Sequence, residues 1–328
     1  MVTMRDIAKK ADVSVGTVSR VLNSDTTLQI SPKTRERILT IAEKNNYTNQ
    51  RDKSQAKKGK IIITGWYTKK VKISDLYFRS LRWNIEMTLK NQNYEIIRTF
   101  FNEQDLDVKG ADGIIAIGHF DQKSLEQLQE AKIPLVIVNQ DTLSYEISCV
   151  TADYFTPVQK IIEHFLKNKF TKIGMIEATS KTEINASPDP RAQAFRNIMI
   201  AKGLLDEEFI FSGDFSTESG YQLMKSAIRK FPSALPSAFF VCSDTMAIGA
   251  MKALQEEQIR IPDDVSIVGF GDLEVGRYLT PSLSTVQLAT QQMGTSAANL
   301  LLNQINGLQT YPVNIVTATK LLFRESSK

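Results

Sequence analysis

Residues 3–23 of the chain read TMRDIAKKADVSVGTVSRVLN, and this stretch decides the fold of the N-terminal part. Thr3 and Ser14 are each typical of a helix N-cap, and each is followed by apolar residues at helical spacing. The inward-facing positions are Ile7, Ala8 and Ala11 in the first helix, then Val18, Val21 and Leu22 in the second. Two short helices separated by a turn of about three residues predict a helix-turn-helix, which lays its second helix in the DNA major groove.

The charge of the chain is unevenly distributed. Residues 1–60 carry 13 Lys and Arg against 6 Asp and Glu, a net charge of +7, whereas the remaining residues carry 27 against 30, a net charge of −3. A basic segment on a mildly acidic body is typical of a module that binds phosphates. This distribution favours DNA binding over the alternative, a small three-helix cap whose outer face is only solvated.

The composition of the 328 residues is ordinary for a globular protein and allows two or three domains. No apolar run approaches the roughly 18 residues of a membrane span, and the polar N-terminus is unlike a signal peptide, so we expect a cytoplasmic protein. Cys149 and Cys242 lie in apolar runs and are expected to be buried, reduced thiols. Neither histidine has metal-ligand spacing, and no nucleotide-binding or nucleophile motif is present, so we expect no enzyme activity, metal or cofactor.

The rest of the chain divides by its pattern. Ser31 and Pro32 begin a third helix, and residues 48–60 have the polar, basic composition of a linker. Apolar runs typical of strands lie at 61–65, 94–100, 113–117, 134–139, 172–176, 238–242 and 265–270. Amphipathic helical stretches lie at 76–92, 121–131, 156–168, 190–203, 217–230, 245–258 and 288–306. This alternation predicts an α/β protein with two doubly wound subdomains, whose ligand site lies at the carboxyl ends of the strands.

Several segments carry a family resemblance. They are VGTVSRVLN at 15–23, SPKTRERI at 31–38, AEKNNY at 42–47, SDTMAIGA at 243–250, IPDDVSIVGF at 261–270 and LSTV at 283–286. In combination they resemble the LacI/GalR family of transcriptional repressors over essentially the whole chain. Within that family the chain is most similar to the galactose and evolved-β-galactosidase repressors, the latter through LNSDTTL at 22–28 and through Ser243.

The resemblance implies a periplasmic-binding-protein-like core behind the helix-turn-helix. The expected domains are the DNA-binding head at 1–47, a basic hinge at 48–60, and two effector-binding subdomains. The first subdomain comprises 61–155 with about 287–316, and the second comprises 156–286 with about 317–328. It also implies a homodimer that binds double-stranded, pseudo-palindromic operator DNA.

For DNA, the resemblance assigns base reading to Val15, Gly16 and Arg20, with Thr17 and Ser19 nearer the backbone. Arg20 can make a bidentate contact to guanine, which discriminates by about 1–3 kcal/mol. Val15 has an alternative place, packed inside the helical bundle. Further phosphate contacts are expected from Ser14, Thr3, Asn23 and Ser31, although helix capping alone would explain Thr3 and Ser31.

Two departures from the family pattern concern the turn and the linker. Asp12 stands where the family usually has glycine. Relatives place a leucine-bearing hinge helix in the minor groove, whereas this linker offers Arg51, Lys53 and Lys57, with Ala56 where leucine is expected. Because unstacking a base step requires a large apolar side chain, we expect weaker kinking of the operator and more lysine–phosphate contacts.

For the effector, the resemblance places Arg191 in the cleft, where its fork can bind two sugar hydroxyls; an arginine at a helix start can also be a surface charge. Phe215 matches an aromatic residue that stacks on the sugar, and Asn139 matches a cleft carboxylate. Further candidates are Asp75, Phe78, Ser243 and Asp272. Gly271 replaces a sugar-binding aspartate of most relatives, so the effector's identity does not carry over. Met246 and Phe270 are expected in the core.

These observations predict a repressor of a carbohydrate operon, released from DNA by a sugar, galactose or a galactoside. One alternative is a regulator of the same family that needs a corepressor, such as a purine, to bind DNA. Another is a cytosolic sugar-binding protein with an incidental basic head.

Overall fold

The computed structural model describes residues 3–22, 25, 28, 30–44, 57–65, 75–101, 106–178 and 189–328, without the side chains of 43, 44, 75 and 76. The α-helices are α1 (Met4–Ala11), α2 (Val15–Leu22), α3 (Pro32–Lys44), α4 (Asp75–Asn91), α5 (Gln122–Glu130), α6 (Phe155–Lys167), α7 (Pro190–Ala201), α8 (Thr217–Lys230), α9 (Asp244–Glu256) and α10 (Thr290–Ile305). The strands are β1 (Lys60–Gly65), β2 (Glu95–Phe100), β3 (Gly113–Ile117), β4 (Leu135–Val138), β5 (Ser148–Ala152), β6 (Ile173–Ala178), β7 (Ile210–Gly213), β8 (Ala238–Val241), β9 (Ser266–Val268), β10 (Thr285–Gln287), β11 (Asn314–Thr317) and β12 (Lys320–Leu322). Short 3₁₀ helices are η2 (Leu143–Tyr145), η3 (Glu207–Phe209) and η4 (Glu274–Tyr278).

The first three helices form a small bundle with the predicted caps. Thr3 and Asp6 make a capping box, in which the Asp6 amide donates to Thr3 Oγ1 at 3.2 Å and the Thr3 amide donates to Asp6 Oδ2 at 2.8 Å. Asp12 ends α1 in the left-handed conformation with a φ of 48°, as expected for a residue that replaces glycine. The Ser14 hydroxyl accepts from the Thr17 amide at 3.0 Å and so caps α2. Local capping chemistry therefore defines both ends of the turn.

A buried apolar stripe from each helix holds this bundle together. The buried residues are Ile7, Ala8, Ala11, Val18, Val21, Leu22, Ile38 and Ala42. They include every inward-facing position predicted for the first two helices. Because these side chains are small and few, the bundle exposes most of its polar residues.

The described chain divides into two compact units, one of residues 1–59 with 89–95 and one of residues 60–88 with 96–328. Residues 89–95 join the N-terminal unit because backbone hydrogen bonds connect Lys58 with Asn93 and Gly59 with Glu95. Within the described residues, no helix is both long and apolar enough to cross a membrane.

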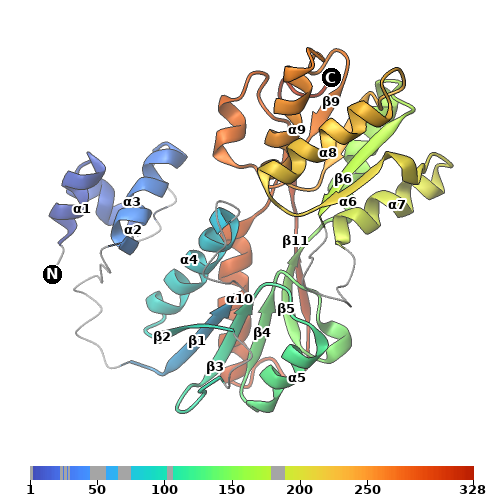
Figure 1. Cartoon of the computed structure of the whole chain (residues 1–328). Coiled ribbons are helices and arrows are strands. Elements are labelled where there is room, and N and C mark those ends of the chain that lie inside the picture. The colour runs from blue at the N-terminus through green and yellow to red at the C-terminus, as the bar shows by residue number, and fades with distance from the viewer. Residues whose placement is uncertain are drawn as a thin grey trace. The chain divides into compact units, whose positions relative to one another are not determined.

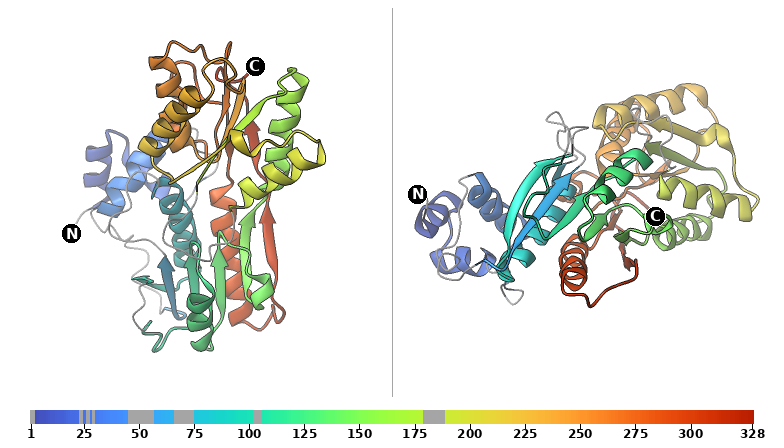
Figure 2. Two further views of the ribbon diagram at one scale, coloured as in Figure 1. Left: turned by 45° about the vertical axis from the view of Figure 1, so that its right-hand side comes forward. Right: turned by 90° about the horizontal axis from the view of Figure 1, so that it is seen from below.

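The larger unit contains two separate parallel sheets, as the α/β pattern predicts (Figure 1). The strands of the first sheet lie in the order β11-β5-β4-β3-β1-β2, and those of the second in the order β7-β6-β8-β9. We call the first sheet with its helices α4, α5 and α10 the first lobe, and the second sheet with α6–α9 the second lobe. Both ribbon views of Figure 2 show α10 beside the first sheet, where it contacts β3, β4, β5 and β11.

The chain passes between the two sheets more than once. After β9 it returns to the first sheet, where β11 pairs in parallel with β5. β12 then pairs with β10 in an antiparallel two-stranded sheet of its own. Beyond β12, Ser326 exchanges hydrogen bonds with Ile267 of β9, so the C-terminal residues pack on the second lobe.

Close helix packing in the second lobe depends on glycine. A Cβ atom on Gly249 of α9 would lie 2.0 Å from the Thr217 carbonyl oxygen of α8, and one on Gly220 of α8 would lie 2.1 Å from the Met246 carbonyl oxygen of α9. The two helices therefore approach each other at positions that accept no side chain. Cys242 is buried in this lobe and Cys149 in the first, both as free thiols, as predicted.

Candidate DNA-binding helix and ligand-binding cluster

The outer face of α2 presents the residues expected to read bases. Val15, Gly16 and Arg20 are exposed, while Thr17 and Ser19 are partly buried at the edges of this face. Val15 is 42% exposed, which excludes the alternative that it packs inside the bundle. The helix therefore offers a narrow, largely uncharged surface that ends in one arginine.

An ion pair holds Arg20 at this surface. Its Nε lies 2.7 Å from Asp25 Oδ2, and its side chain remains 49% exposed. The Asp25 carbonyl oxygen also accepts from Arg35 of α3 at 3.3 Å, which ties Asp25 to the bundle. An exposed pair of this kind adds little stability, but it orients the guanidinium.

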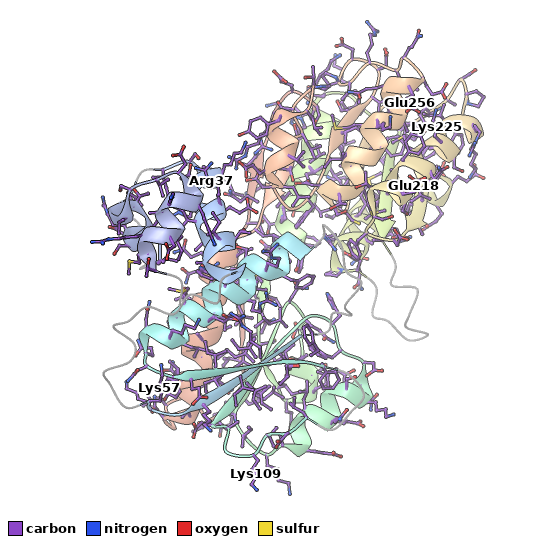
Figure 3. The ribbon with its side chains drawn as sticks, turned by 60° about the vertical axis from the view of Figure 1, so that its left-hand side comes forward. Arg37, Lys57, Lys109, Glu218, Lys225 and Glu256 are labelled. Carbon is purple, nitrogen blue, oxygen red and sulfur yellow. The ribbon has the colours of Figure 1, made fainter. Side chains whose placement is uncertain are left out.

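The other residues expected to contact DNA differ in what the structure describes. Ser14, Thr3 and Ser31 are exposed, and each hydroxyl accepts a capping hydrogen bond. Lys57 is exposed, as is Arg37 of α3 (Figure 3). Asn23, Arg51, Lys53 and Ala56 lie outside the described residues.

A second group of polar and aromatic side chains gathers at the carboxyl ends of both sheets of the larger unit. We call this group the Arg191 cluster; it comprises Tyr77, His119, Asn139, Tyr154, Asp189, Arg191, Phe215, Cys242 and Phe270. His119 follows β3, Asn139 follows β4, Phe215 follows β7 and Phe270 follows β9. Parallel sheets bind their ligands at this edge.

Arg191, in the first turn of α7, is held by both its own helix and a neighbouring strand end. Its Nε donates to Asp189 Oδ1 at 2.8 Å, and its Nη2 donates to Asp189 Oδ2. Its Nη1 donates to the Cys242 carbonyl oxygen at 2.7 Å. Asp189 is also the N-cap of α7 and accepts from the Arg191 amide. The guanidinium is therefore fixed in place, and not all of its N–H groups have a hydrogen-bond partner among the described residues.

Three aromatic rings surround this guanidinium. The Arg191 Cζ atom lies 5.3 Å from the ring centroid of Phe270, 5.4 Å from that of Phe215 and 5.9 Å from that of Tyr154. Phe270 is buried as expected, yet it also contributes to this site. Cation–π contacts at these distances stabilise the charge and leave apolar faces beside its donors.

Asn139 anchors the part of the cluster that comes from the first lobe. The hydroxyls of Tyr77 and Tyr154 both donate to its Oδ1, at 2.8 Å and 3.0 Å, and its Nδ2 lies 3.1 Å from His119 Nε2. Asn139 is buried and has a φ of 81°, which asparagine tolerates better than most residues. Because Tyr154 also contacts Arg191, the two halves form one continuous network.

The ionisation states follow from burial and from Arg191. Burial raises the pKa of Tyr154 to about 12 and that of Tyr77 well above 10, so both hydroxyls stay protonated and donate. Although part of His119 stays exposed, desolvation and then the Arg191 charge lower its pKa. Burial alone would raise the pKa of Asp189, but the adjacent Arg191 outweighs it and holds that pKa below 3.8. Among the described residues no three His, Cys, Asp or Glu side chains are grouped to hold a metal ion.

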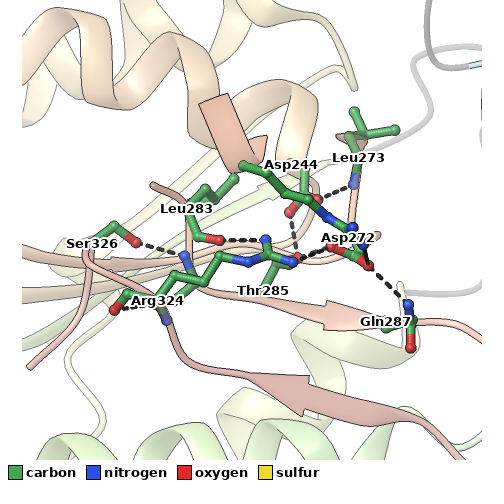
Figure 4. Close-up of polar contacts among 10 residues, drawn as sticks. Asp244, Asp272, Leu273, Leu283, Thr285, Gln287, Arg324 and Ser326 are labelled. Carbon is green, nitrogen blue, oxygen red and sulfur yellow. Dashed lines mark hydrogen bonds and ion pairs between the residues drawn. The ribbon is translucent and has the colours of Figure 1, made fainter. Parts of the chain in front are cut away.

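Asp272 belongs to a different network in the second lobe (Figure 4). Its Oδ1 accepts from Arg324, and its Oδ2 accepts from Arg277 at 2.8 Å and from Gln287 at 2.9 Å. Beside it, buried Asp244 accepts from the Thr285 hydroxyl at 2.6 Å and the Leu273 amide at 2.7 Å. Both oxygens of Asp272 thus accept hydrogen bonds from other side chains of the protein, and its role as an effector contact stays a prediction.

The structure brings together most of the residues expected at the effector site. Arg191, Phe215 and Asn139 belong to the cluster, and Phe78 packs edge-on against Tyr77 with ring centroids 5.1 Å apart. Ser243 adjoins Cys242 but caps α9 by accepting from the Met246 amide. Asp75 begins α4, and its side chain lies outside the described part.

Sequence reasoning missed four members of the cluster: Tyr77, His119, Tyr154 and Asp189. His119 could have been found from its place just after β3, whereas Tyr154 follows β5, a strand that the sequence pattern does not predict. Asp189 precedes the proline that begins α7, so the sequence predicts its role as a helix cap. The sequence does not predict its ion pair with the Arg191 side chain.

Comparison with known proteins agrees with this arrangement. The family described as bacterial regulatory proteins, lacI family, matches residues 3–50, and a periplasmic binding protein-like domain matches residues 162–327. A structure of the transcriptional regulator CelR in complex with cellobiose has a TM-score of 0.72 and 24% identity, with all of both chains covered. The lac repressor dimer bound to operator and the anti-inducer ONPF has a TM-score of 0.70 and 20% identity, with 99% of both chains covered. At these identities the structures show the fold.

Two regulators are similar over their full length. The HTH-type transcriptional regulator GalR of Lacticaseibacillus casei is 36% identical over 330 residues, and that of Streptococcus thermophilus is 38% identical over 335 residues. In both cases the whole of each chain is covered. The chain therefore belongs to the lacI family of bacterial regulatory proteins, and it is a DNA-binding transcriptional regulator, not an enzyme.

Proposed function

We propose that this protein represses a carbohydrate-utilisation operon and that galactose or a galactoside releases it from its operator. The observation that carries the proposal is the full-length similarity to two regulators named GalR. The Arg191 cluster supports it, because an arginine fork beside aromatic faces suits a sugar ring, whose hydroxyls accept hydrogen bonds while its C–H faces pack on rings.

On DNA, the outer face of α2 enters the major groove. Arg20 donates to a guanine edge, while Val15 and Gly16 contact or clear neighbouring bases. Phosphates bind at the start of α2 near Ser14 and Thr17 and at exposed basic residues such as Lys57. The exposure of these residues supports this assignment.

The effector binds at the Arg191 cluster. The unused N–H groups of Arg191 donate to two ring hydroxyls, and Phe215, which is 38% exposed, packs on the apolar face of the ring. Asn139, Ser243 and Phe78 complete the surroundings from both lobes. Asp272 is a weaker candidate, because both of its oxygens already accept hydrogen bonds from the protein.

The proposal includes the domain division, the assembly and the place of action. The head spans 1–47, the hinge 48–60, and the two subdomains the remainder, with the division near residues 155, 287 and 317. A homodimer binds a pseudo-palindromic operator in the cytoplasm, because a two-fold protein reads two half-sites related by the same symmetry. A similar fold in the lac repressor dimer bound to operator supports this part.

The regulation follows from linkage. A sugar that binds the two lobes more tightly in one arrangement shifts the protein towards that arrangement and changes how its heads fit two half-sites. A typical coupling of 1–3 kcal/mol changes operator affinity by about 5–150-fold.

Titration of DNA with the full-length protein tests the proposal. The operator is first selected from random duplexes, and binding is then measured by fluorescence anisotropy with and without galactose. We expect an inverted repeat to be selected and galactose to weaken its binding by at least about fivefold. Stronger binding with galactose or with a purine would instead identify a corepressor, and an unchanged affinity with every sugar would refute the proposal.

A further inference from the structure

The charge of Arg191 is already neutralised inside the protein. Asp189 occupies its Nε and Nη2 in a bidentate pair, and the Asp189 side chain is only 9% exposed. The Arg191 side chain is 16% exposed, so the pair is largely shielded from water. A ligand that reaches this guanidinium therefore meets an ion pair with no net charge.

No other cation accompanies this pair among the described residues that contact Arg191 or Asn139. These contacts come from Tyr77, Tyr154, Phe215 and Phe270, from the Cys242 carbonyl oxygen, and from His119. Only His119 can gain a positive charge, and both desolvation and the nearby Arg191 disfavour its protonated form. Apart from His119, the described residues of the cluster therefore carry no net charge.

From this geometry we infer that Asp189 determines the charge class of the ligand, restricting the Arg191 cluster to uncharged, unphosphorylated sugars. The inference rests on the proposed function, in which a sugar is the effector. Asp189 acts through Arg191: it aims the guanidinium and cancels its charge, and Arg191 makes the contact.

The physical reason is competition for one cation. A phosphate or carboxylate that approached the remaining N–H groups of Arg191 would lie within a few ångströms of the Asp189 carboxylate. Two anions on one guanidinium repel each other, most strongly where water is excluded. A hydroxyl oxygen accepts from the same N–H groups without that cost, and the rings of Phe215 and Phe270 contribute apolar faces.

Capping alone would also explain an aspartate before α7, and the test separates the two roles. Asp189→Asn and Asp189→Ser keep a side chain that caps helices well but remove the negative charge. Asp206→Asn is the matched control, because Asp206 caps η3 in the same lobe and accepts from the Glu208 amide at 3.0 Å, outside the cluster. Circular dichroism melts establish that each variant is folded.

The measurement is isothermal titration calorimetry of the full-length protein with galactose, galactose 6-phosphate and galacturonate. We expect wild type and Asp206→Asn to bind galactose at least about tenfold more tightly than either anionic sugar. We expect Asp189→Asn and Asp189→Ser to change the ratio of the affinity for galactose to the affinity for each anionic sugar by about tenfold or more, in favour of the anionic sugar.

Two results would overturn the inference and leave the proposed function standing. In one, wild type binds an anionic sugar as tightly as galactose; in the other, both Asp189 variants keep the wild-type ratio. If sugars of neither charge class bind wild type, the proposed function fails and the inference fails with it.

Discussion

Two aspartates of the larger unit form the same kind of ion pair with an arginine, but the residues around the two pairs differ. Asp189 and Asp272 each bind an arginine through a largely buried carboxylate. Around Asp272 the remaining partners are further donors, Arg277 and Gln287, which close the network. Around Arg191 the remaining described partners are the Cys242 carbonyl oxygen and aromatic rings. Not every N–H group of Arg191 has a hydrogen-bond partner among the described residues, whereas both oxygens of Asp272 already accept hydrogen bonds.

Replacing Arg20 with alanine tests the base-reading residue of α2. Because a bidentate arginine–guanine contact discriminates by about 1–3 kcal/mol, we expect Arg20→Ala to weaken binding to the selected operator by about 5–150-fold and to relax preference at one base pair. Anisotropy titrations with the selected site and with each single-base variant provide the measurement.

Lys9→Ala is the matched control, since Lys9 is exposed and lies on α1 instead of α2. It should reduce binding to selected and random DNA by a similar factor. Equal losses on selected and random DNA for Arg20→Ala would show that Arg20 contacts only phosphate.

Asp244 predicts a pH-dependent contribution to stability. Burial, opposed by hydrogen bonds from Thr285 and Leu273, raises its pKa from 3.8 to about 6. Between these values the folded protein binds a proton that the unfolded chain releases, so stability rises as the pH falls through this window. From pH 7.5 to pH 5.0 this group should add about 1 kcal/mol to the free energy of unfolding.

Urea denaturation of wild type and Asp244→Asn at both pH values isolates that contribution. The asparagine variant cannot titrate, so its stability should rise by about 1 kcal/mol less than that of wild type over the same interval. Parallel changes in the two proteins would mean that Asp244 has no raised pKa in the folded state.

At the level of helices and strands, the network of Figure 4 joins segments that are distant in the chain. Asp272, just after β9, binds Arg324, which follows β12 and also donates to the Leu283 carbonyl oxygen. Ser326 then bonds to β9. The C-terminal segment is thereby fastened to the second lobe by side chains that no local pattern connects.

Removing Asp272 should therefore lower the free energy of unfolding and have little effect on the affinity for sugar. Arg324 is only 17% exposed, and loss of its partner leaves a charge poorly compensated, at a cost of about 3 kcal/mol. We expect Asp272→Ala to lower the free energy of unfolding by about this amount in urea titrations. Asp264→Ala, which removes an exposed pair with Arg260, should lower the free energy of unfolding far less, because solvent screens an exposed pair. If a folded Asp272→Ala variant lost much of its affinity for galactose, Asp272 would be a residue that contacts the effector.

The elements that could be predicted from the sequence are those with strong local signals. The caps at Thr3 and Ser14 and the apolar stripes of α1 and α2 specify the bundle, and long apolar runs specify β1, β3 and β8. β5, with the sequence SCVTA, was not predicted because it mixes polar residues into a fully buried strand. Its Thr151 hydroxyl is satisfied by Asn314 next to it in the sheet, which only the fold reveals.

The ligand site also contains residues that the sequence identifies and residues that only the tertiary structure brings together. Arg191 and Phe215 are identified through a family resemblance, and in the structure the Arg191 Cζ atom lies 5.4 Å from the Phe215 ring centroid. Tyr77 could not be placed, because its partner Asn139 comes from another strand end, distant in the chain. Side chains that meet only through tertiary structure leave no periodic signal.

At the level of the whole chain, the basic N-terminal part predicts salt-dependent DNA binding. With Ala56 where relatives have leucine, we expect lysine–phosphate contacts to dominate, so affinity should fall steeply as salt rises. Lys57→Ala should reduce the slope of log K against log salt by about 1 with little change in base preference. The measurement is a set of operator titrations at several salt concentrations.

Lys109→Ala serves as the control, because Lys109 is equally exposed but lies in the larger unit, before β3 (Figure 3). It should leave the slope unchanged. A weak salt dependence in wild type, or an operator kink as sharp as that of the lac repressor, would contradict the expectation for this linker.

In the proposed function, one chain couples a DNA-binding head to a unit that binds a sugar. Coupling between two binding sites is reciprocal, so the factor by which galactose weakens operator binding must equal the factor by which operator weakens galactose binding. Calorimetric titration of galactose into the full-length protein, free and saturated with the selected operator, measures this directly. We expect the dissociation constant of galactose to be at least about fivefold higher on DNA, and identical constants in the two titrations would show that the two sites are not coupled.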